Sequence, residues 1–261
     1  MMRAILGGLF SRAEAERHFA LIQAHLAFPD GVRLMDRPAP YAGGVARVFQ
    51  RAETAACFGR EIGLMYVHAH LRYAETLAVM GKADDLLRAL LQATPILLQE
   101  TVPNALPRQS NVYFSSSDGA FADRYEAQAR FEELRAGRVP VRGGWRLYSS
   151  GPGIYTALVI TRLLGLRRHY EHVVLDPVLP AALNGLEADV RFLGRLIRWR
   201  YRVTARGEPA VRINGVTPAG LEPEPNPYRR GGLRLPRAAF LGALGPGENL
   251  VEIRTSCAPT A

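Results

Sequence analysis

Two histidines stand close together in the segment Tyr66-Val-His68-Ala-His70. The apolar spacing around them predicts a helix, and residues two apart on a helix point to nearly opposite sides. A zinc-binding pair on a helix needs a spacing of four residues, so this is not such a pair. At most one of the two histidines therefore faces a site, either as a ligand-binding group or as a hydrogen-bonded structural side chain.

A second segment, Ser149-Ser150-Gly151-Pro-Gly153, runs into a predicted helix. The first amides of a helix have no partner within the helix, and together with the helix dipole they favour an anion. The Ser150 hydroxyl and the amides beside Gly151 suit a phosphate group, although the same residues also form plain helix caps and tight turns. The sequence has no GxxxxGK[ST] motif, which excludes a nucleotide-binding P-loop.

A third segment, residues 108–118, mixes amides, hydroxyls, aromatic rings and one carboxylate, Asp118. Sugar recognition needs directed hydrogen bonds beside a flat apolar surface, and this mixture supplies both. A solvated polar loop has the same composition. The sequence contains neither a GxSxG elbow nor a CxxC motif.

Helices are expected to position these segments over the first two thirds of the chain. Ser11 with Glu14 is a capping-box signature. Asp84 and Asp85 favour a helix start because negative charge suits that end of the helix dipole. Apolar spacing and Gly/Pro breaks predict five helices: 11–26, 64–80, 84–94, 121–136 (capped by Asp118 or a neighbouring serine), and one from 151–153 to about 166.

The last third of the sequence changes period. Residues 186–192 and 197–203 alternate apolar and polar side chains, as half-buried strands do. Asn214-Gly215 is a strong hairpin signal, and residues 249–255 are expected to form a closing strand. The fold class predicted is mainly α followed by β, with a helical domain over residues 1–175 and a β domain over 176–261.

Composition is that of an ordinary globular protein of 261 residues with a formal charge of +9. Its positive charge is not concentrated in one stripe, so we expect no nucleic-acid partner. No apolar stretch has the roughly 20 residues that a membrane span needs. Two cysteines 200 residues apart favour a reducing cytoplasm. The densest group of arginines is interpreted as a solvated strand face: Arg191, Arg195, Arg198, Arg200 and Arg202.

Several strings together resemble the inverting glycoside phosphorylases of the cellobiose phosphorylase family, glycoside hydrolase family 94. Within it they look most like 1,2-β-oligoglucan phosphorylases and the phosphorylase-like region of cyclic β-1,2-glucan synthases. The resemblance implies the C-terminal part of an (α/α)6 barrel followed by a β-sandwich. The strings are Arg51-Ala-Glu53, residues 59–73, Ser115-Ser-Ser-Asp118, residues 144–153, residues 175–180 and Asn226-Pro-Tyr-Arg-Arg-Gly-Gly-Leu-Arg234.

The same resemblance implies roles for individual residues. His68, Ser150 and Gly151 match the residues of the family that bind the attacking phosphate. Arg60 and Glu61 match a basic–acidic pair near the acceptor sugar. Further sugar-binding candidates are Arg51, Glu53 and Asp118.

The chain departs from the family at the catalytic acid. Inverting phosphorolysis needs one carboxylic acid to protonate the leaving oxygen, while phosphate itself replaces the activated water. The family's acid lies in an upstream aspartate motif. Asp30 and Asp36 do not match that motif, so no catalytic residue is assigned in this chain.

The favoured hypothesis is therefore a fragment of a phosphorylase that converts β-1,2-glucooligosaccharides and phosphate to α-glucose 1-phosphate, a hexosyltransferase-type reaction. We expect the fragment to be inactive alone. The candidate protein partners are a missing N-terminal half or further copies of this chain in a homo-oligomer. Phosphate is a substrate, and no metal or organic cofactor is implied. The alternative is a non-catalytic carbohydrate- or phosphate-binding protein. A hydrolase using Asp118 and Glu53 has no motif support.

Overall fold

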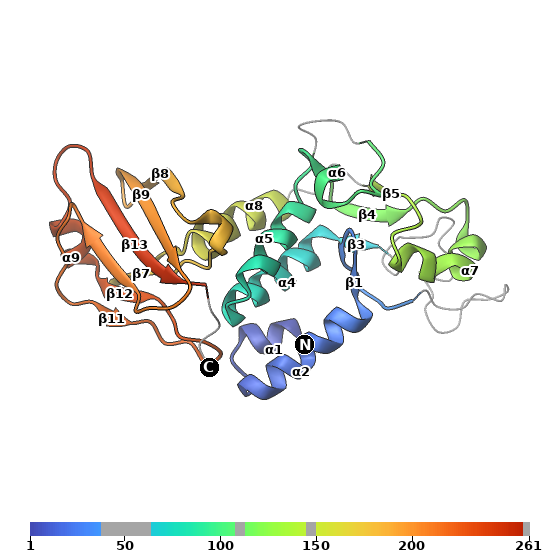
Figure 1. Cartoon of the computed structure of the whole chain (residues 1–261), viewed down its shortest axis with the longest axis horizontal. Coiled ribbons are helices and arrows are strands. Elements are labelled where there is room, and N and C mark those ends of the chain that lie inside the picture. Colours follow the sequence, from blue (N-terminus) through green and yellow to red (C-terminus); the bar gives the residue numbers. More distant parts are fainter. Residues whose placement is uncertain (38–63, 108–112, 145–149, 258–261) are drawn as a thin grey trace. The chain divides into compact units, whose positions relative to one another are not determined.

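The computed structural model describes residues 1–37, 64–107, 113–144 and 150–257 (Figure 1). The chain divides into two compact units. The helical unit comprises Met1–Ala74 and Arg88–Tyr155, and the β unit comprises Glu75–Leu87 and Thr156–Ala261. Each unit is described separately below.

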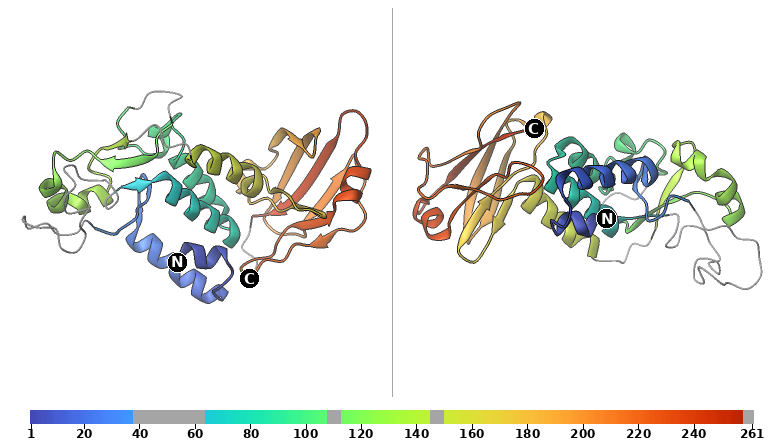
Figure 2. Two further views of the ribbon diagram at one scale, coloured as in Figure 1. Left: turned by 180° about the vertical axis from the view of Figure 1, so that it is seen from behind. Right: turned by 90° about the horizontal axis from the view of Figure 1, so that it is seen from below.

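The helical unit begins with two helices that lie side by side in both views, α1 (Met2–Leu6) and α2 (Arg12–His25) (Figure 2). The predicted capping box is confirmed: the Ser11 side chain accepts from the Glu14 amide, and the Glu14 carboxylate accepts from the Ser11 amide at 2.9 Å. Phe19 and Ile22 of α2 are buried, as their helical spacing predicts. A short strand pair follows, β1 (Ala27–Phe28) and β2 (Gly31–Val32).

The second predicted helix begins later than its apolar stripe suggests. Leu64 and Met65 are buried, but Met65 and Tyr66 form strand β3 (Met65–Tyr66), and α4 (Val67–Met80) starts directly after it. Gly81, with φ of +76°, follows the end of α4, where a residue with a left-handed backbone is favoured. Next come α5 (Ala83–Gln92), with Asp84 and Asp85 in its first turn as expected, and the short α6 (Leu98–Thr101).

A three-stranded antiparallel sheet in the order β3-β4-β5 was not predicted. Strand β4 (Ser116–Gly119) lies in the middle and β5 (Val141–Gly144) on its far side. Asp118 is therefore a strand residue, and the expectation that it caps the following helix is wrong. Asp123 caps α7 (Arg124–Arg135) instead, through bonds of 2.9 Å from the amides of Tyr125 and Glu126.

The fifth predicted helix begins slightly earlier than expected. Helix α8 (Ser150–Leu158) includes the Gly-Pro-Gly segment in its first turn and continues as a π-helical turn, η1 (Val159–Leu163). The chain then becomes extended at β6 (Leu166–Arg168). The expected change from helices to strands along the chain is confirmed.

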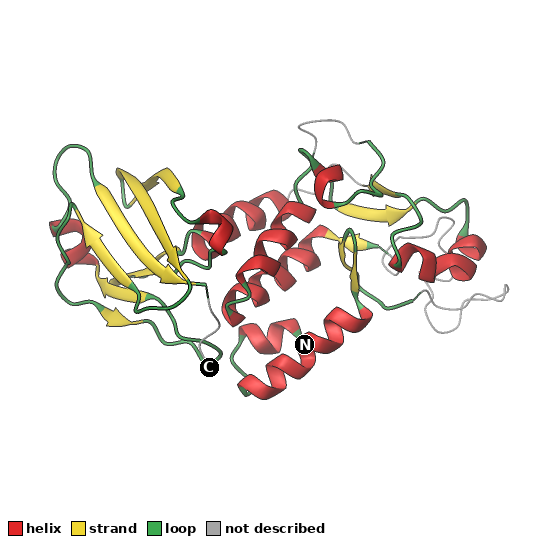
Figure 3. Ribbon diagram, viewed as in Figure 1, coloured by secondary structure: helices red, strands yellow, loops and turns green. Residues whose placement is uncertain are grey.

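The β unit contains two four-stranded sheets, drawn in yellow in Figure 3. One sheet has the order β11-β12-β7-β6, and the other β10-β13-β9-β8. The predicted closing strand is present, but it pairs with β9 in parallel, whereas the other neighbours pair antiparallel. The remaining strands and helices of this unit are β7 (His172–Leu175), η2 (Ala181–Leu183), β8 (Glu187–Phe192), β9 (Arg195–Thr204), β10 (Ala210–Ile213), β11 (Glu222–Pro223), β12 (Leu233–Pro236), α9 (Arg237–Gly242) and β13 (Leu250–Ser256).

An aromatic cluster forms part of the core of the β unit. The indole of Trp199 is fully buried, meets Phe192 edge-on at 5.6 Å and stacks on Phe240 at 6.2 Å between ring centroids. Because Phe240 belongs to α9, which packs on β7 and β12, the cluster joins α9 to β8 and β9. The arginines interpreted as a solvated strand face are all exposed, as expected: Arg191, Arg195, Arg198, Arg200 and Arg202.

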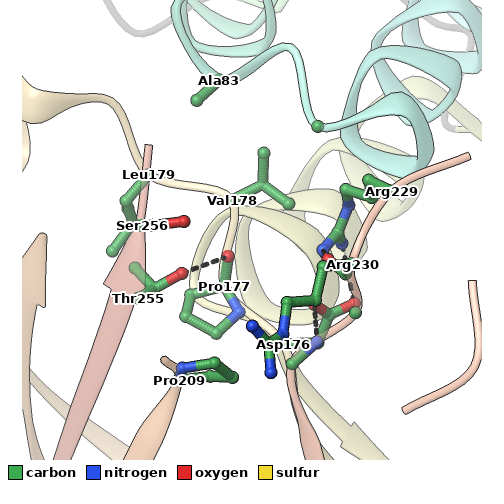
Figure 4. Close-up of a pocket in the computed structure, with 13 residues that line it drawn as sticks. Ala83, Asp176, Pro177, Val178, Leu179, Pro209, Arg229, Arg230, Thr255 and Ser256 are labelled. Atoms are coloured by element: carbon green, nitrogen blue, oxygen red, sulfur yellow. Dashed lines mark hydrogen bonds and ion pairs between the residues drawn. The ribbon is translucent and has the colours of Figure 1, made fainter. Parts of the chain in front are cut away.

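A buried ion cluster anchors the segment before β12 to the rest of the β unit (Figure 4). Arg229 donates to both carboxylate oxygens of Asp176 at 2.8 Å, and Arg167 lies 3.0 Å from the same carboxylate. Arg229 also donates to the Ala78 carbonyl at 3.2 Å, so it ties Asp176 to the end of α4. A cavity of about 50 Å³ lies beside this cluster.

In the described part of the chain, none of the helices is long and apolar enough to cross a membrane.

Candidate functional site

The β3-β4-β5 sheet of the helical unit leads into α4 and, further along the chain, precedes α8. Strand β3 leads without a loop into α4, so His68 is the second residue of that helix. Strand β5 ends at Gly144, six residues before α8 begins. Ser115 links both places, because its carbonyl accepts from the Val67 amide at 2.9 Å and its own amide donates to the Gly144 carbonyl at 3.2 Å.

The two histidines of α4 have different surroundings, as their spacing predicts. His70 is fully buried: its Nδ1 accepts from the Val32 amide at 3.1 Å, and its Nε2 donates to the Ala89 carbonyl at 2.7 Å. Burial lowers the pKa of His70, which keeps the imidazole neutral and structural. His68 is only half-buried, and its ring stacks on that of Tyr66 at 6.0 Å.

Gly151 lies in the first turn of α8 against the side chain of Tyr113. The Tyr113 hydroxyl occupies the place where a β-carbon on residue 151 would be. A side chain at residue 151 would therefore displace the Tyr113 phenol. The backbone of Gly151 is not left-handed, so this packing is the constraint on the residue. Tyr113 is also near Tyr66, because the charge of Tyr66 contributes to raising the Tyr113 pKa. Tyr66 in turn stacks on His68, so the two tyrosine rings lie between Gly151 and His68.

Asp118 and Ser116 project from the same face of β4 toward Gly144 of β5. A β-carbon on residue 144 would come within 2.6 Å of Ser116 Oγ and 3.3 Å of Asp118 Oδ2. Alternate residues of a strand share a face, so the two polar groups form a pair beside the end of β5. Ser116 is buried and Asp118 is partly buried, so Asp118 is the one of the two that stays partly accessible. A carboxylate supplies the directed hydrogen bonds that sugar recognition requires.

The structure also shows the surroundings of Asp30 and Asp36, the two aspartates that do not match the family's acid motif. Asp30 is buried, and Arg33 holds both of its carboxylate oxygens, at 3.0 and 2.8 Å. A carboxylate that is already paired in this way is not available as a general acid. Asp36 is partly exposed, with 41% of its side chain accessible, and its carboxylate lies 3.5 Å from the Arg37 guanidinium.

Not all of the predicted site residues can be located. The side chain of Ser150 and four sugar-site candidates lie outside the part of the chain that the structure describes; the four are Arg51, Glu53, Arg60 and Glu61. Among the described residues, no three His, Cys, Asp or Glu side chains form a group that could hold a metal ion.

Sequence reasoning missed the two tyrosines that connect the site, Tyr66 and Tyr113. Both stood in segments that had been singled out, but neither has a spacing that marks it as functional. Strand β3 has only two residues and β4 only four, which is too short for alternation to be recognised.

Parts of this chain are similar in sequence to known proteins. Residues 165–253 match the glycoside phosphorylase C-terminal domain. The 1,2-beta-oligoglucan phosphorylase of Listeria innocua is 46% identical over 237 residues, which are 91% of this chain and 22% of that protein. The cyclic beta-(1,2)-glucan synthase NdvB of Rhizobium meliloti is 28% identical over 156 residues, 59% of this chain and 5% of the relative. The chain therefore spans about a fifth of the length of the Listeria protein and a smaller share of the Rhizobium protein.

Proposed function

Because residues 165–253 are a glycoside phosphorylase C-terminal domain, we propose that the chain is the C-terminal part of an inverting phosphorylase of β-1,2-glucooligosaccharides. The name of the Listeria relative and its 46% identity support this substrate class. The helical unit would then be the C-terminal part of an (α/α)6 barrel, and the β unit the β-sandwich that follows it.

The observation that carries the proposal is the contact of two helix starts with residues 113–115. His68 stands at the start of α4, whose first residue, Val67, is bonded to Ser115. Gly151, at the start of α8, lies against Tyr113, two residues before Ser115. A helix start supplies unpaired amides and a positive dipole end to an anion. We assign His68, Ser150 and Gly151 to the binding of inorganic phosphate.

In the proposed reaction, this chain binds the phosphate and another part of a larger enzyme supplies the acid. A phosphate oxygen attacks the anomeric carbon, the bond to the leaving oxygen breaks, and a carboxylic acid donates the proton that this oxygen needs. The products are α-glucose 1-phosphate and an oligosaccharide one unit shorter. Arg33 donates to both carboxylate oxygens of Asp30. We therefore propose that the acid comes from residues that are not in this sequence.

Sugar binding is proposed for Asp118, on the strand that follows Ser115. Asp118, paired with Ser116 beside Gly144, would accept hydrogen bonds from sugar hydroxyls. The other proposed sugar contacts are Arg51, Glu53, Arg60 and Glu61. No metal or organic cofactor is assigned a role in this chemistry, and the cytoplasm is the proposed compartment.

Titration calorimetry with inorganic phosphate tests the proposal on the chain as it stands. We expect saturable phosphate binding that is lost in His68→Ala and unchanged in His25→Ala, a control at an exposed position on α2. Absence of phosphate binding would contradict the assignment of the site. If β-1,2-glucooligosaccharides bind but phosphate does not, the non-catalytic carbohydrate-binding alternative is favoured.

A further inference from the structure

Tyr113 is a residue of the site that neither the family match nor the reaction described above uses. Its hydroxyl lies against the α-carbon of Gly151, at the first turn of α8. Among the described residues, this hydroxyl has no protein hydrogen-bond partner. A phenol that packs its ring against the protein and directs its hydroxyl to a helix start is well placed to bind an anion together with the helix amides.

The charge state of the phenol suits the same role. Burial, with a contribution from Tyr66, raises the pKa of Tyr113 to about 12. The hydroxyl therefore stays protonated over the whole physiological range and can donate a hydrogen bond. An anionic phenolate would repel phosphate, whereas the protonated phenol can donate to it.

The surroundings of Tyr113 also fix its position. Its ring stacks on Phe114 at 6.4 Å between centroids, and Phe114 is buried. The next residue, Ser115, holds the start of α4 and the end of β5 through its backbone. This anchoring beside β4 limits how far the phenol can move, so less entropy is lost when it binds a ligand.

We propose that the Tyr113 hydroxyl donates a hydrogen bond to the phosphate held between His68 and the start of α8. This inference rests on the proposed function, because it names a further ligand for the same phosphate. It also gives Gly151 a second purpose: a side chain at residue 151 would push the phenol away from the anion.

The test is phosphate titration of the whole chain carrying Tyr113→Phe, which keeps the ring and removes the hydroxyl. Loss of one hydrogen bond to a charged group predicts phosphate binding weaker by about tenfold or more. Tyr170→Phe is the matched control, because Tyr170 is 90% exposed in the β unit and should leave phosphate affinity unchanged.

A second variant keeps the test valid if Tyr113→Phe alters the fold. Incorporation of 3,5-difluorotyrosine at position 113 preserves the hydroxyl and the ring but lowers the pKa of the phenol. Phosphate affinity of this variant should fall as pH rises through that lowered pKa, while the affinity of the unmodified chain follows no such step.

The outcomes separate this inference from the proposed function. Weakened binding in Tyr113→Phe together with loss in His68→Ala supports both. Loss in His68→Ala with unchanged affinity in Tyr113→Phe, or no added pH step in the fluorinated chain, overturns the role of Tyr113 alone. Absence of phosphate binding by the unmodified chain overturns both.

Discussion

The hydroxyl of Tyr113 lies where a β-carbon on Gly151 would stand, so a side chain at residue 151 would have to displace the phenol. Two residues further along the same helix, a β-carbon on Gly153 would meet no atom within 4 Å. The two glycines thus have opposite packing constraints within one helical turn. This contrast provides a direct test of the packing at the candidate site.

Alanine substitutions at these two glycines should change stability in opposite directions. Gly153→Ala reduces the backbone freedom of the unfolded chain at a position that is helical in the folded protein. It should stabilise the chain by up to about 1 kcal/mol. Gly151→Ala forces Tyr113 to move and should destabilise by about 1–3 kcal/mol. Urea unfolding measures both. Equal effects at the two positions would show that Tyr113 does not pack on Gly151.

The penalty at residue 151 should also depend on Tyr113. In a Tyr113→Ala background the clashing ring is absent, and Gly151→Ala should then cost little. Neighbouring residues that share a contact are non-additive in this way. Additive free energies of unfolding in the double variant would contradict the contact.

A pH dependence of stability is expected from His70. Its folded pKa lies below the ordinary value of 6.5, first because of burial; its bond to the Ala89 carbonyl and the charge of Asp30 oppose this shift only in part. The unfolded chain therefore binds a proton that the folded chain excludes. Stability from this residue is complete above pH 6.5 and falls as the pH decreases, by at most about 1.4 kcal/mol per pH unit.

Urea midpoints at pH 7.5 and pH 5.5 measure this effect, with His70→Gln as the comparison. The glutamine variant is expected to be less stable at pH 7.5 but to lose less stability on acidification. His169→Gln, at an exposed histidine of the β unit, serves as control. An identical acid-side loss in His70→Gln would show that another group causes it.

The ion cluster of the β unit should be essential to its stability. Burial raises the pKa of Asp176, but Arg229 and Arg167 outweigh burial and leave the pKa lowered, so the carboxylate is charged at neutral pH. Asp176→Asn leaves two arginines in a mostly buried place without their counter-charge, which costs about 3–5 kcal/mol.

The matched control for Asp176 is Asp189→Asn. Asp189 is half-exposed and pairs with Arg198 on the surface of the sheet, where ion pairs contribute little. Its urea midpoint is expected to stay near that of the unmodified chain. A similar small effect for Asp176→Asn would mean that the cluster is solvated in solution.

Much of the fold follows from the sequence where the signal is local. The capping box at Ser11 and Glu14 forms as predicted, because it involves only residues within one helical turn. The Asn214-Gly215 turn also forms, with φ of +50° and +83° at its two residues and a bridge between Ile213 and Val216. Both signals depend on short-range hydrogen bonds or backbone angles.

Pairing between distant segments did not follow from the sequence. Strand β13 pairs in parallel with β9, and nothing in the alternation of residues 250–256 selects that partner. Asp118 was expected at a helix cap, yet it pairs with Arg142 in the strand register of β4 and β5. The resemblance to a known family identified His68 and Gly151, but the tyrosine between them became evident only from the packing.

The Asn214-Gly215 turn supplies a further prediction. Gly215 has open space around its α-carbon but a left-handed backbone, so Gly215→Ala should cost about 1 kcal/mol through backbone strain alone. Gly242→Ala, which also has open space but no positive φ, should not destabilise the chain. Thermal unfolding of both variants checks this. Equal melting temperatures would show that residue 215 is not held in the left-handed region.

The central claim is that this chain supplies the phosphate-binding part of a β-1,2-glucan phosphorylase. The most direct measurement is glucose 1-phosphate release by a chimera in which this chain replaces the matching region of the Listeria innocua relative, which is 46% identical to it. We predict release by the chimera, a loss of about 100-fold or more in its His68→Ala form, and no release by this chain alone. A folded chimera that releases no glucose 1-phosphate, or one that keeps full activity after His68→Ala, would contradict the claim.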